Sequence, residues 1–322
     1  MAVRPIDAAI AHTGARKIQV TGGRRSSPLL IALGALWVLD GLLQLQPSMF
    51  TRAFLTDAIA PAAQGQPWFV TGPIGWTVRF LGPHIALWNA GFALVQIAIG
   101  VGIMWRPTAR LALGASFTWA AAVWWLGEGL GGLASGQGSL LTGGPGAVVL
   151  YAVIGAILWP RRTDGRPFGK GRVGGAVGRI AWLVLWVGAG ATQLASHTVA
   201  SQLADAAGDE PPFLAALDRA MARLAPTAHG LPAAIVLGCL ELGIGLGVLA
   251  PRGRRVALGT GIAVSVLMWI LVQDFGGLFT GTATDPNAAP LYVLLAAALY
   301  RFTTAEASAE DDVTRVATRP GG

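Results

Sequence analysis

The sequence predicts an all-α, polytopic membrane protein with eight transmembrane helices arranged as two four-helix repeats of the same orientation. Three observations predict this fold class: the composition, a series of apolar segments and an internal repeat. Of the 322 residues, 53% are hydrophobic and only 12% are charged, whereas soluble domains have about 25% charged residues. The mean hydropathy is +0.58. This balance excludes an ordinary soluble enzyme, a disordered chain and a nucleic-acid-binding protein.

Eight apolar segments are the predicted transmembrane helices. A helix needs about 20 residues to cross about 30 Å of hydrocarbon, and the fourth and eighth segments are shorter than this. Few charged residues fall inside the segments. The segments cover residues 29–46, 84–105, 109–126, 145–159, 176–195, 230–250, 256–273 and 288–301.

The 23 Lys and Arg residues are divided unequally between the two ends of these helices. Nineteen lie in the N-terminal tail, in the C-terminal end from Arg301 onward, in the basic stretch 160–179 and in two short links, and four lie in the remaining loops. By the positive-inside rule, the side with 19 basic residues is cytoplasmic. We therefore expect a multi-pass protein of the plasma (inner) membrane with both termini in the cytoplasm. The net charge of +7 then reflects insertion and contact with anionic lipids, and no nucleic-acid partner is expected.

The second half of the chain repeats the first half. A shift of 145 residues aligns residues 84–150 without a gap at 17 identities in 67, and an even number of helices per copy predicts the same orientation for both copies. The aligned pairs include His84 with His229, Gly100 with Gly245, Trp124 with Trp269, and Pro145 with Pro290. The predicted parts are an N-terminal tail (1–27), a first unit (28–160), a basic linker (161–175), a second unit (176–302) and a C-terminal tail (303–322).

Two long loops, one in each unit, contain amphipathic or aromatic pieces. In 213–225, one face is apolar and the other is charged, which predicts a helix lying in the membrane interface. Aromatic residues in the first loop are expected to be interfacial anchors, and a lateral gate or a partner surface is the alternative. These residues are Phe50, Phe54, Trp68, Phe69 and Trp76.

Five polar side chains inside the apolar segments form a candidate intramembrane polar site: Asp40, Gln44, Gln96, Gln193 and Glu241. A carboxyl group in hydrocarbon is costly and usually faces a bundle interior or a cavity. The repeat aligns Gln96 with Glu241, so one unit has a titratable group where the other has an amide. Two interpretations stay open, namely hydrogen bonds that join helices and a role in binding a proton or a substrate.

A second candidate site lies at the opposite side from the termini. Glu128 and Asp274 each follow a predicted helix and precede a glycine-rich turn, which predicts either a helix end or an acidic, glycine-lined outer vestibule. Three histidines lie on the same side, namely His84, His197 and His229. Imidazole and carboxylate are metal ligands, but the spacing matches no tight ligand motif, so no metal site is predicted.

The single cysteine, Cys239, lies in an apolar run and is expected to be a small buried residue without redox chemistry. Glycines 243, 245 and 247 on the same segment predict close helix packing. No P-loop, nucleophile elbow or zinc-protease motif is present, and no covalent haem, flavin or iron–sulfur motif is present. The chain is therefore not expected to be catalytic alone.

The second unit resembles the DoxX-like membrane family through LGCLELGIGLGVLAPRGRRVALGTG, in which a carboxylate precedes a glycine-rich run and a short basic turn. The first unit has the same layout in LVQIAIGVGIMWRPTARLALGAS, with Gln96 in place of the acid. The resemblance covers most of the chain as two tandem copies. It implies a four-helix bundle per unit and a place beside membrane redox chemistry, with Glu241 as the position of interest.

Three functions follow from these observations. The resemblance favours an accessory or anchoring subunit for quinone- or thiol-linked redox chemistry, with a redox partner protein and quinone as a possible cofactor. The intramembrane carboxyls and the acidic outer face favour a transporter of a small solute, protons or a metal ion. The third function is a quinone-linked oxidoreductase, which would need a bound cofactor.

Overall fold

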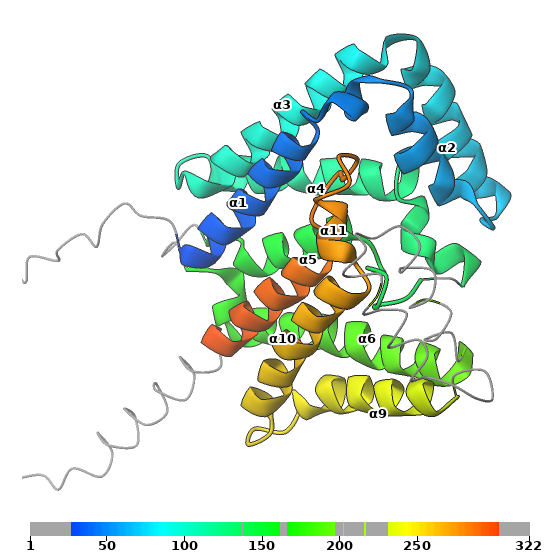
Figure 1. The fold of residues 1–322 in the computed structure, drawn as a ribbon. Helices are drawn as coiled ribbons and strands as arrows, with labels where there is room; N and C mark the ends of the chain where they lie inside the picture. The colour runs from blue at the N-terminus through cyan, green and yellow to red at the C-terminus, as the bar shows by residue number, and fades with distance from the viewer. Residues whose placement is uncertain are drawn as a thin grey trace, which may run out of the picture.

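A computed structural model describes residues 27–136, 138–161, 166–196, 202, 216 and 231–302. The described chain is helical (Figure 1), and the only β-type pairing within these residues is an isolated bridge between Pro160 and Pro167. The predicted helix 213–225 falls outside the described residues apart from position 216, and so do His197 and His229.

One helix lies in each of the eight apolar segments. In the first unit these are α1 (Pro28–Leu43), α3 (Ile85–Met104), α4 (Ala109–Leu126) and α5 (Ala147–Leu158). In the second unit they are α6 (Arg172–Ser196), α9 (Leu231–Gly247), α10 (Arg254–Leu271) and the C-terminal helix (Ala289–Phe302).

Three described helical stretches are long and apolar enough to cross a membrane. They are Trp68–Met104, Val173–Ser196 and Arg254–Leu271. Five other apolar helices have 10 to 17 residues, and α5, for example, has 12. The all-helical class is therefore confirmed, and three of the helical stretches are candidates for crossing a membrane.

The long loop of the first unit contains a helix that was not predicted. Helix α2 (Trp68–Leu81) leads through the 3₁₀ turn Gly82–His84 into α3, and it contains Pro73 in its interior. Three short helical turns precede it, at Pro47–Phe50, Phe54–Ile59 and Ala60–Ala63. A small separate core stabilises this region by burying apolar side chains. The core consists of Met49, Phe54, Leu55, Ile59, Val70, Ile74, Leu81 and Ile85.

Glycines bring the first and second apolar helices of each unit into backbone contact. A Cβ atom on Gly100 of α3 would lie 2.5 Å from the Gly34 carbonyl oxygen of α1 and 2.7 Å from the Val38 nitrogen. A Cβ atom on Gly245 of α9 would lie 3.0 Å from the Val187 nitrogen of α6. Gly100 and Gly245 are aligned by the repeat, so the two units pack this helix pair in the same way.

The predicted packing by the glycines of α9 is confirmed for two of the three residues. Gly245 packs on α6, and a Cβ atom on Gly247 would lie 2.7 Å from Cβ of Ala257 in α10, whereas Gly243 has no neighbour within 4 Å. The expectation that Cys239 is buried is wrong, because its side chain is exposed. Cys239 therefore lies on the outer surface of α9 in this chain.

Each unit has a short left-handed turn after its third apolar helix. In the first unit, residues 129–132 have φ angles of 56°, 57°, 60° and 73°. In the second unit, residues 274–277 have φ angles of 43°, 52°, 75° and 67°. Glycine adopts this conformation at no steric cost, and each turn has two or three glycines. The turn lets the chain reverse and pass over the end of the helix.

The gapless pairing of Pro145 with Pro290 is wrong for this part of the repeat. The indole nitrogen of Trp124 donates a hydrogen bond to the Pro145 carbonyl at 2.8 Å, and that of Trp269 donates to the Pro286 carbonyl at 2.8 Å. The loop of the second unit is therefore four residues shorter between these partners. A fixed-offset alignment cannot follow this difference, because chain length is free to vary in a loop.

The main hydrophobic core combines residues of both units. It includes Trp37 and Tyr151 of the first unit together with Trp182, Trp186 and Tyr292 of the second unit. The ring centroids of Trp37 and Tyr151 lie 4.5 Å apart, and those of Trp186 and Tyr292 lie 6.5 Å apart. In Figure 1, α5 and the C-terminal helix run between the outer helix pairs of the two units. A shared core of this kind holds the units together through apolar burial.

Candidate functional site

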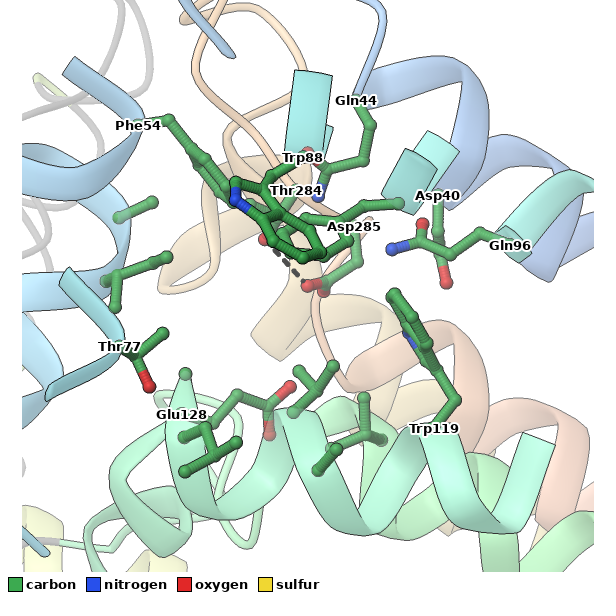
Figure 2. A pocket seen from close by; sticks show the side chains of 18 of the residues that line it. Asp40, Gln44, Phe54, Thr77, Trp88, Gln96, Trp119, Glu128, Thr284 and Asp285 are labelled. Carbon is green, nitrogen blue, oxygen red and sulfur yellow. Dashed lines mark hydrogen bonds between the residues drawn. The ribbon is translucent and has the colours of Figure 1, made fainter. Parts of the chain in front are cut away.

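A cavity of about 330 Å³ lies within the first unit and is called the aromatic cavity here. Its size is within the range of small-molecule sites. Helices α1, α2, α3, α4 and α5 contribute to its walls, and so does the loop of the second unit (Figure 2). Most of the lining is apolar and much of it is aromatic. The phenylalanine and tryptophan residues of the lining are Trp37, Phe54, Trp76, Phe80, Trp88, Phe92 and Trp119.

Three of the five predicted intramembrane polar residues meet in the aromatic cavity. Asp40 projects from α1, Gln44 is the residue directly after α1, and Gln96 projects from α3. All three are buried, and each has a side-chain oxygen without a hydrogen-bond partner. A buried polar atom without a partner costs about 1–3 kcal/mol. Interhelical hydrogen bonds therefore do not account for these oxygens, which favours a ligand as their partner.

Glu128 lines the same cavity from the residues that follow α4. The backbone N–H of Val148 donates a hydrogen bond to its carboxylate, while its Oε2 atom is buried without a partner. A Cβ atom on Gly146 would collide with this Oε2 atom, so glycine at 146 leaves room for the carboxyl. Burial, reinforced by the negative charge of Asp285 and opposed by the Val148 N–H, raises the pKa of Glu128 to about 8.

Asp285 is a cavity residue that was not predicted from the sequence. It belongs to the loop of the second unit, and its carboxyl points into the aromatic cavity of the first unit (Figure 2). The Thr284 hydroxyl donates to its Oδ2 atom at 3.0 Å, and the Asn287 N–H donates to Oδ1 at 2.7 Å. Burial raises the pKa of Asp285, and these two hydrogen bonds oppose the rise.

The loop that presents Asp285 is held against the first unit by two side chains of the α1–α2 link. Gln46 Nε2 donates to the Ala283 carbonyl at 2.9 Å, and the Ser48 hydroxyl donates to the Gly281 carbonyl at 2.5 Å. The second unit therefore completes the cavity of the first. No sequence pattern indicated this contact, because it joins residues more than 230 positions apart.

A second, polar hollow of about 650 Å³ adjoins the aromatic cavity and is called the vestibule here. Glycines of both loops, together with threonines and Asn287, line it. Glu128 and Asp285 line both hollows, so they lie where the two meet. Of the residues predicted for an outer vestibule, Glu128 lines this hollow. Asp274 is buried in the other left-handed turn, where burial raises its pKa, and it is not among the lining residues. His84 is exposed beside α3 and lines neither hollow.

The charge balance of the two hollows is one-sided. Asp40, Glu128 and Asp285 line the aromatic cavity, and Asp40 lies within electrostatic range of the other two carboxyls. None of the described lining residues of either hollow is Lys, Arg or His. No group of three or more His, Cys, Asp or Glu residues within the described chain is arranged to hold a metal ion. The site therefore has carboxyls without a protein counter-ion.

The remaining predicted polar residues lie in the second unit, away from the aromatic cavity. Glu241 is fully buried on α9, and neither of its carboxylate oxygens has a hydrogen-bond partner. Gln193 Nε2 donates to the Ser139 hydroxyl at 3.4 Å. Neither residue is among those that line the two hollows. The structure therefore separates the predicted five-residue site into two groups.

Gln273 occupies the position of the second unit that the repeat aligns with Glu128. Its Oε1 atom accepts a hydrogen bond from the Ala289 N–H at 3.1 Å, and its Nε2 atom donates to the Leu141 carbonyl at 3.1 Å. The amide is thus bonded on both sides within the protein. Glu128 has a free oxygen instead, which is the difference expected between a structural and a ligand-binding group.

Comparison with known proteins found no match: no family model, no curated protein and no solved structure is similar to this chain.

Proposed function

We propose that this protein binds a small, partly apolar organic cation in the aromatic cavity and exchanges it for a proton during transport across the membrane. One observation carries the proposal: an aromatic-walled cavity contains three carboxyls and no basic side chain among its described lining residues. Aromatic faces attract cations, and a carboxylate in a buried site needs a positive partner. A cationic ligand with apolar surface satisfies both kinds of group.

The exchange for a proton follows from the state of Glu128. With its pKa at about 8, the carboxyl of the empty site is mostly protonated at pH 7. A bound cation favours the carboxylate, so binding releases a proton, and a higher proton concentration on one side expels the ligand. Asp285 and Asp40 face the same space and add to the negative charge.

The proposal includes eight membrane-spanning helices, arranged as two units of the same orientation. It places the protein in the plasma membrane with both termini in the cytoplasm. The equivalent glycine contacts and left-handed turns of the two units support the duplication. Helix α5 has 12 residues, about 18 Å at 1.5 Å per residue. Non-helical backbone then fills part of the membrane depth, which is tolerated where it lines a cavity.

The pH dependence of binding tests this function. The probe is the fluorescent cation dimethylaminostyryl-N-methylpyridinium, added to the full chain in lipid nanodiscs. We expect its Kd to be about tenfold higher at pH 7 than at pH 9, and tenfold higher again at pH 6, because protons compete for Glu128 below a pKa of about 8. Glu128→Gln should bind weakly and show a flatter pH dependence. Adding Gln273→Glu to this variant places a carboxyl at the equivalent position of the second unit, and we expect that it does not restore probe binding. A wild-type Kd that is constant from pH 6 to pH 9 would contradict the exchange.

A redox-associated subunit remains the second candidate function, and one observation favours it. The indole nitrogen of Trp37 is a buried donor without a partner in the aromatic cavity, and quinone carbonyls accept such hydrogen bonds. The resemblance to DoxX-like units points the same way. Native mass spectrometry of the protein in mild detergent separates the two functions. Retained quinone or a redox partner protein would support the second, and a bare particle that binds the styrylpyridinium cation would support the first.

A further inference from the structure

Five aromatic side chains form a continuous series from the surface of the protein into the aromatic cavity, and we call it the aromatic ladder. Trp76 and Phe80 of α2 stack with ring centroids 4.9 Å apart and an interplanar angle of 10°. Phe80 lies 5.1 Å from Trp88 of α3. The series continues from Trp88 to Phe92 at 6.4 Å and from Phe92 to Trp119 of α4 at 5.5 Å.

The outer members of the aromatic ladder are exposed although they line the cavity. The exposed fractions are 52% for Trp76, 48% for Phe80 and 37% for Trp88. A side chain that is both a cavity wall and half exposed lies at an opening. The three residues belong to α2 and α3, and these helices lie at the edge of the fold away from α6 and α9 (Figure 1). The opening is distinct from the vestibule, since none of these three residues lines that hollow.

The chemistry of the opening matches the membrane and not the aqueous phase. Apart from Thr77, the α2 and α3 residues beside the opening that line the cavity are apolar. Leu87, one position before Trp88, is 74% exposed. Indole and phenyl rings favour the level of the lipid headgroups and the upper acyl chains. Exposed Arg79 of α2 also suits this level, where its guanidinium reaches the headgroups.

The geometry points to a lateral entrance, through which a membrane-dissolved amphiphilic cation passes between α2 and α3 along the aromatic ladder to the carboxyls. This inference rests on the proposed function and specifies its substrate class: an amphiphile with a flat or quaternary cationic head that partitions into lipid.

Trp68, which lies on α2 with Trp76 and Phe80, provides a contrast. It is 82% exposed but does not line the cavity, which is the arrangement of a simple interfacial anchor.

The rate of probe capture tests the entrance. Two cations with the same head are compared in nanodiscs: dimethylaminostyryl-N-methylpyridinium, which is water-soluble, and its N-hexadecyl analogue, which resides in the bilayer. Phe80→Arg places a positive charge at the opening. We expect it to slow capture of the hexadecyl probe at least tenfold more than it slows capture of the soluble probe, which also reaches Glu128 and Asp285 from the vestibule that they line. The matched control Trp68→Arg should slow neither probe.

A second variant acts in the opposite direction. Phe80→Ala widens the opening and should accelerate capture of the hexadecyl probe, which a folding defect does not do. Equal slowing of both probes by Phe80→Arg, or slowing by Trp68→Arg as well, would overturn the lateral entrance, as would rates that neither Phe80 variant changes. The interfacial-anchor interpretation would then hold. If neither probe binds the wild-type protein, the cation-binding function itself fails, and the entrance falls with it.

Discussion

Asp40→Asn is expected to reduce the affinity of the aromatic cavity for the styrylpyridinium cation about 100-fold. Asp40 is 4% exposed and has an unpartnered Oδ1 atom. A charge pair in such a site is weakly screened, and a 100-fold loss corresponds to about 2.7 kcal/mol, close to the cost of breaking a buried pair. Asparagine keeps the shape of the side chain and removes the charge. Fluorescence titration of the probe in nanodiscs at pH 9 measures the effect with Glu128 ionised.

Glu241→Gln is the matched control for this prediction. Glu241 is also a fully buried carboxyl on an apolar helix, but it lies outside both hollows. We expect the probe Kd of this variant to stay within twofold of the wild-type value. An Asp40→Asn variant that binds as tightly as wild type, or a Glu241→Gln variant that loses binding, would place the cation site elsewhere in the chain.

Gly100→Val is expected to separate α1 from α3 and to destabilise the protein by about 1–3 kcal/mol. The new Cβ atom would lie 2.5 Å from the Gly34 carbonyl oxygen and 2.7 Å from the Val38 nitrogen. Both neighbours are backbone atoms, so neither moves by a change of rotamer. Because α1 holds Asp40 and α3 holds Gln96, the same variant should also weaken probe binding. Unfolding in mixed SDS micelles, followed by far-UV circular dichroism, measures the stability.

Gly91→Val on the same helix controls for the β-branched side chain. A Cβ atom on Gly91 would have no neighbour within 4 Å, so this variant incurs the propensity cost of valine without a collision. We expect its unfolding curve to lie near that of the wild type. Equal destabilisation by the two variants would mean that helix propensity, and not the close contact of α1 with α3, limits stability.

Much of the fold was predictable from the sequence, because apolar runs of the right length mark helices whatever they pack against. The glycines of α9 also indicated close packing, and two of the three made it. Helix α2 was missed because it contains Pro73 and two glycines, which disfavour an isolated helix. It forms because Val70, Ile74 and Leu81 bury their side chains in a local core, a tertiary effect that no local pattern reveals.

The candidate site was predictable only where the helices themselves position it. Asp40, Gln44 and Gln96 were identifiable because a polar residue in an apolar helix is costly and rare. Asp285 lies in a polar turn, where an acidic residue is ordinary, and its role depends on contacts with Gln46 and Ser48 of the other unit. Glu241 looked equivalent to a site residue, but it does not line the aromatic cavity, which lies in the first unit.

The two units differ in which aligned positions have a carboxyl group, and this difference has a consequence for the number of ligands bound per chain. On the proposed duplication, Asp40 and Glu128 correspond to Ala189 and to Gln273, which is hydrogen-bonded within the protein. A symmetric homodimer must present two identical receptors. A fused pair is free of that requirement, so one half can specialise in recognition while the other supplies scaffold and a single loop. Saturation should therefore occur at one ligand per polypeptide, despite two homologous halves.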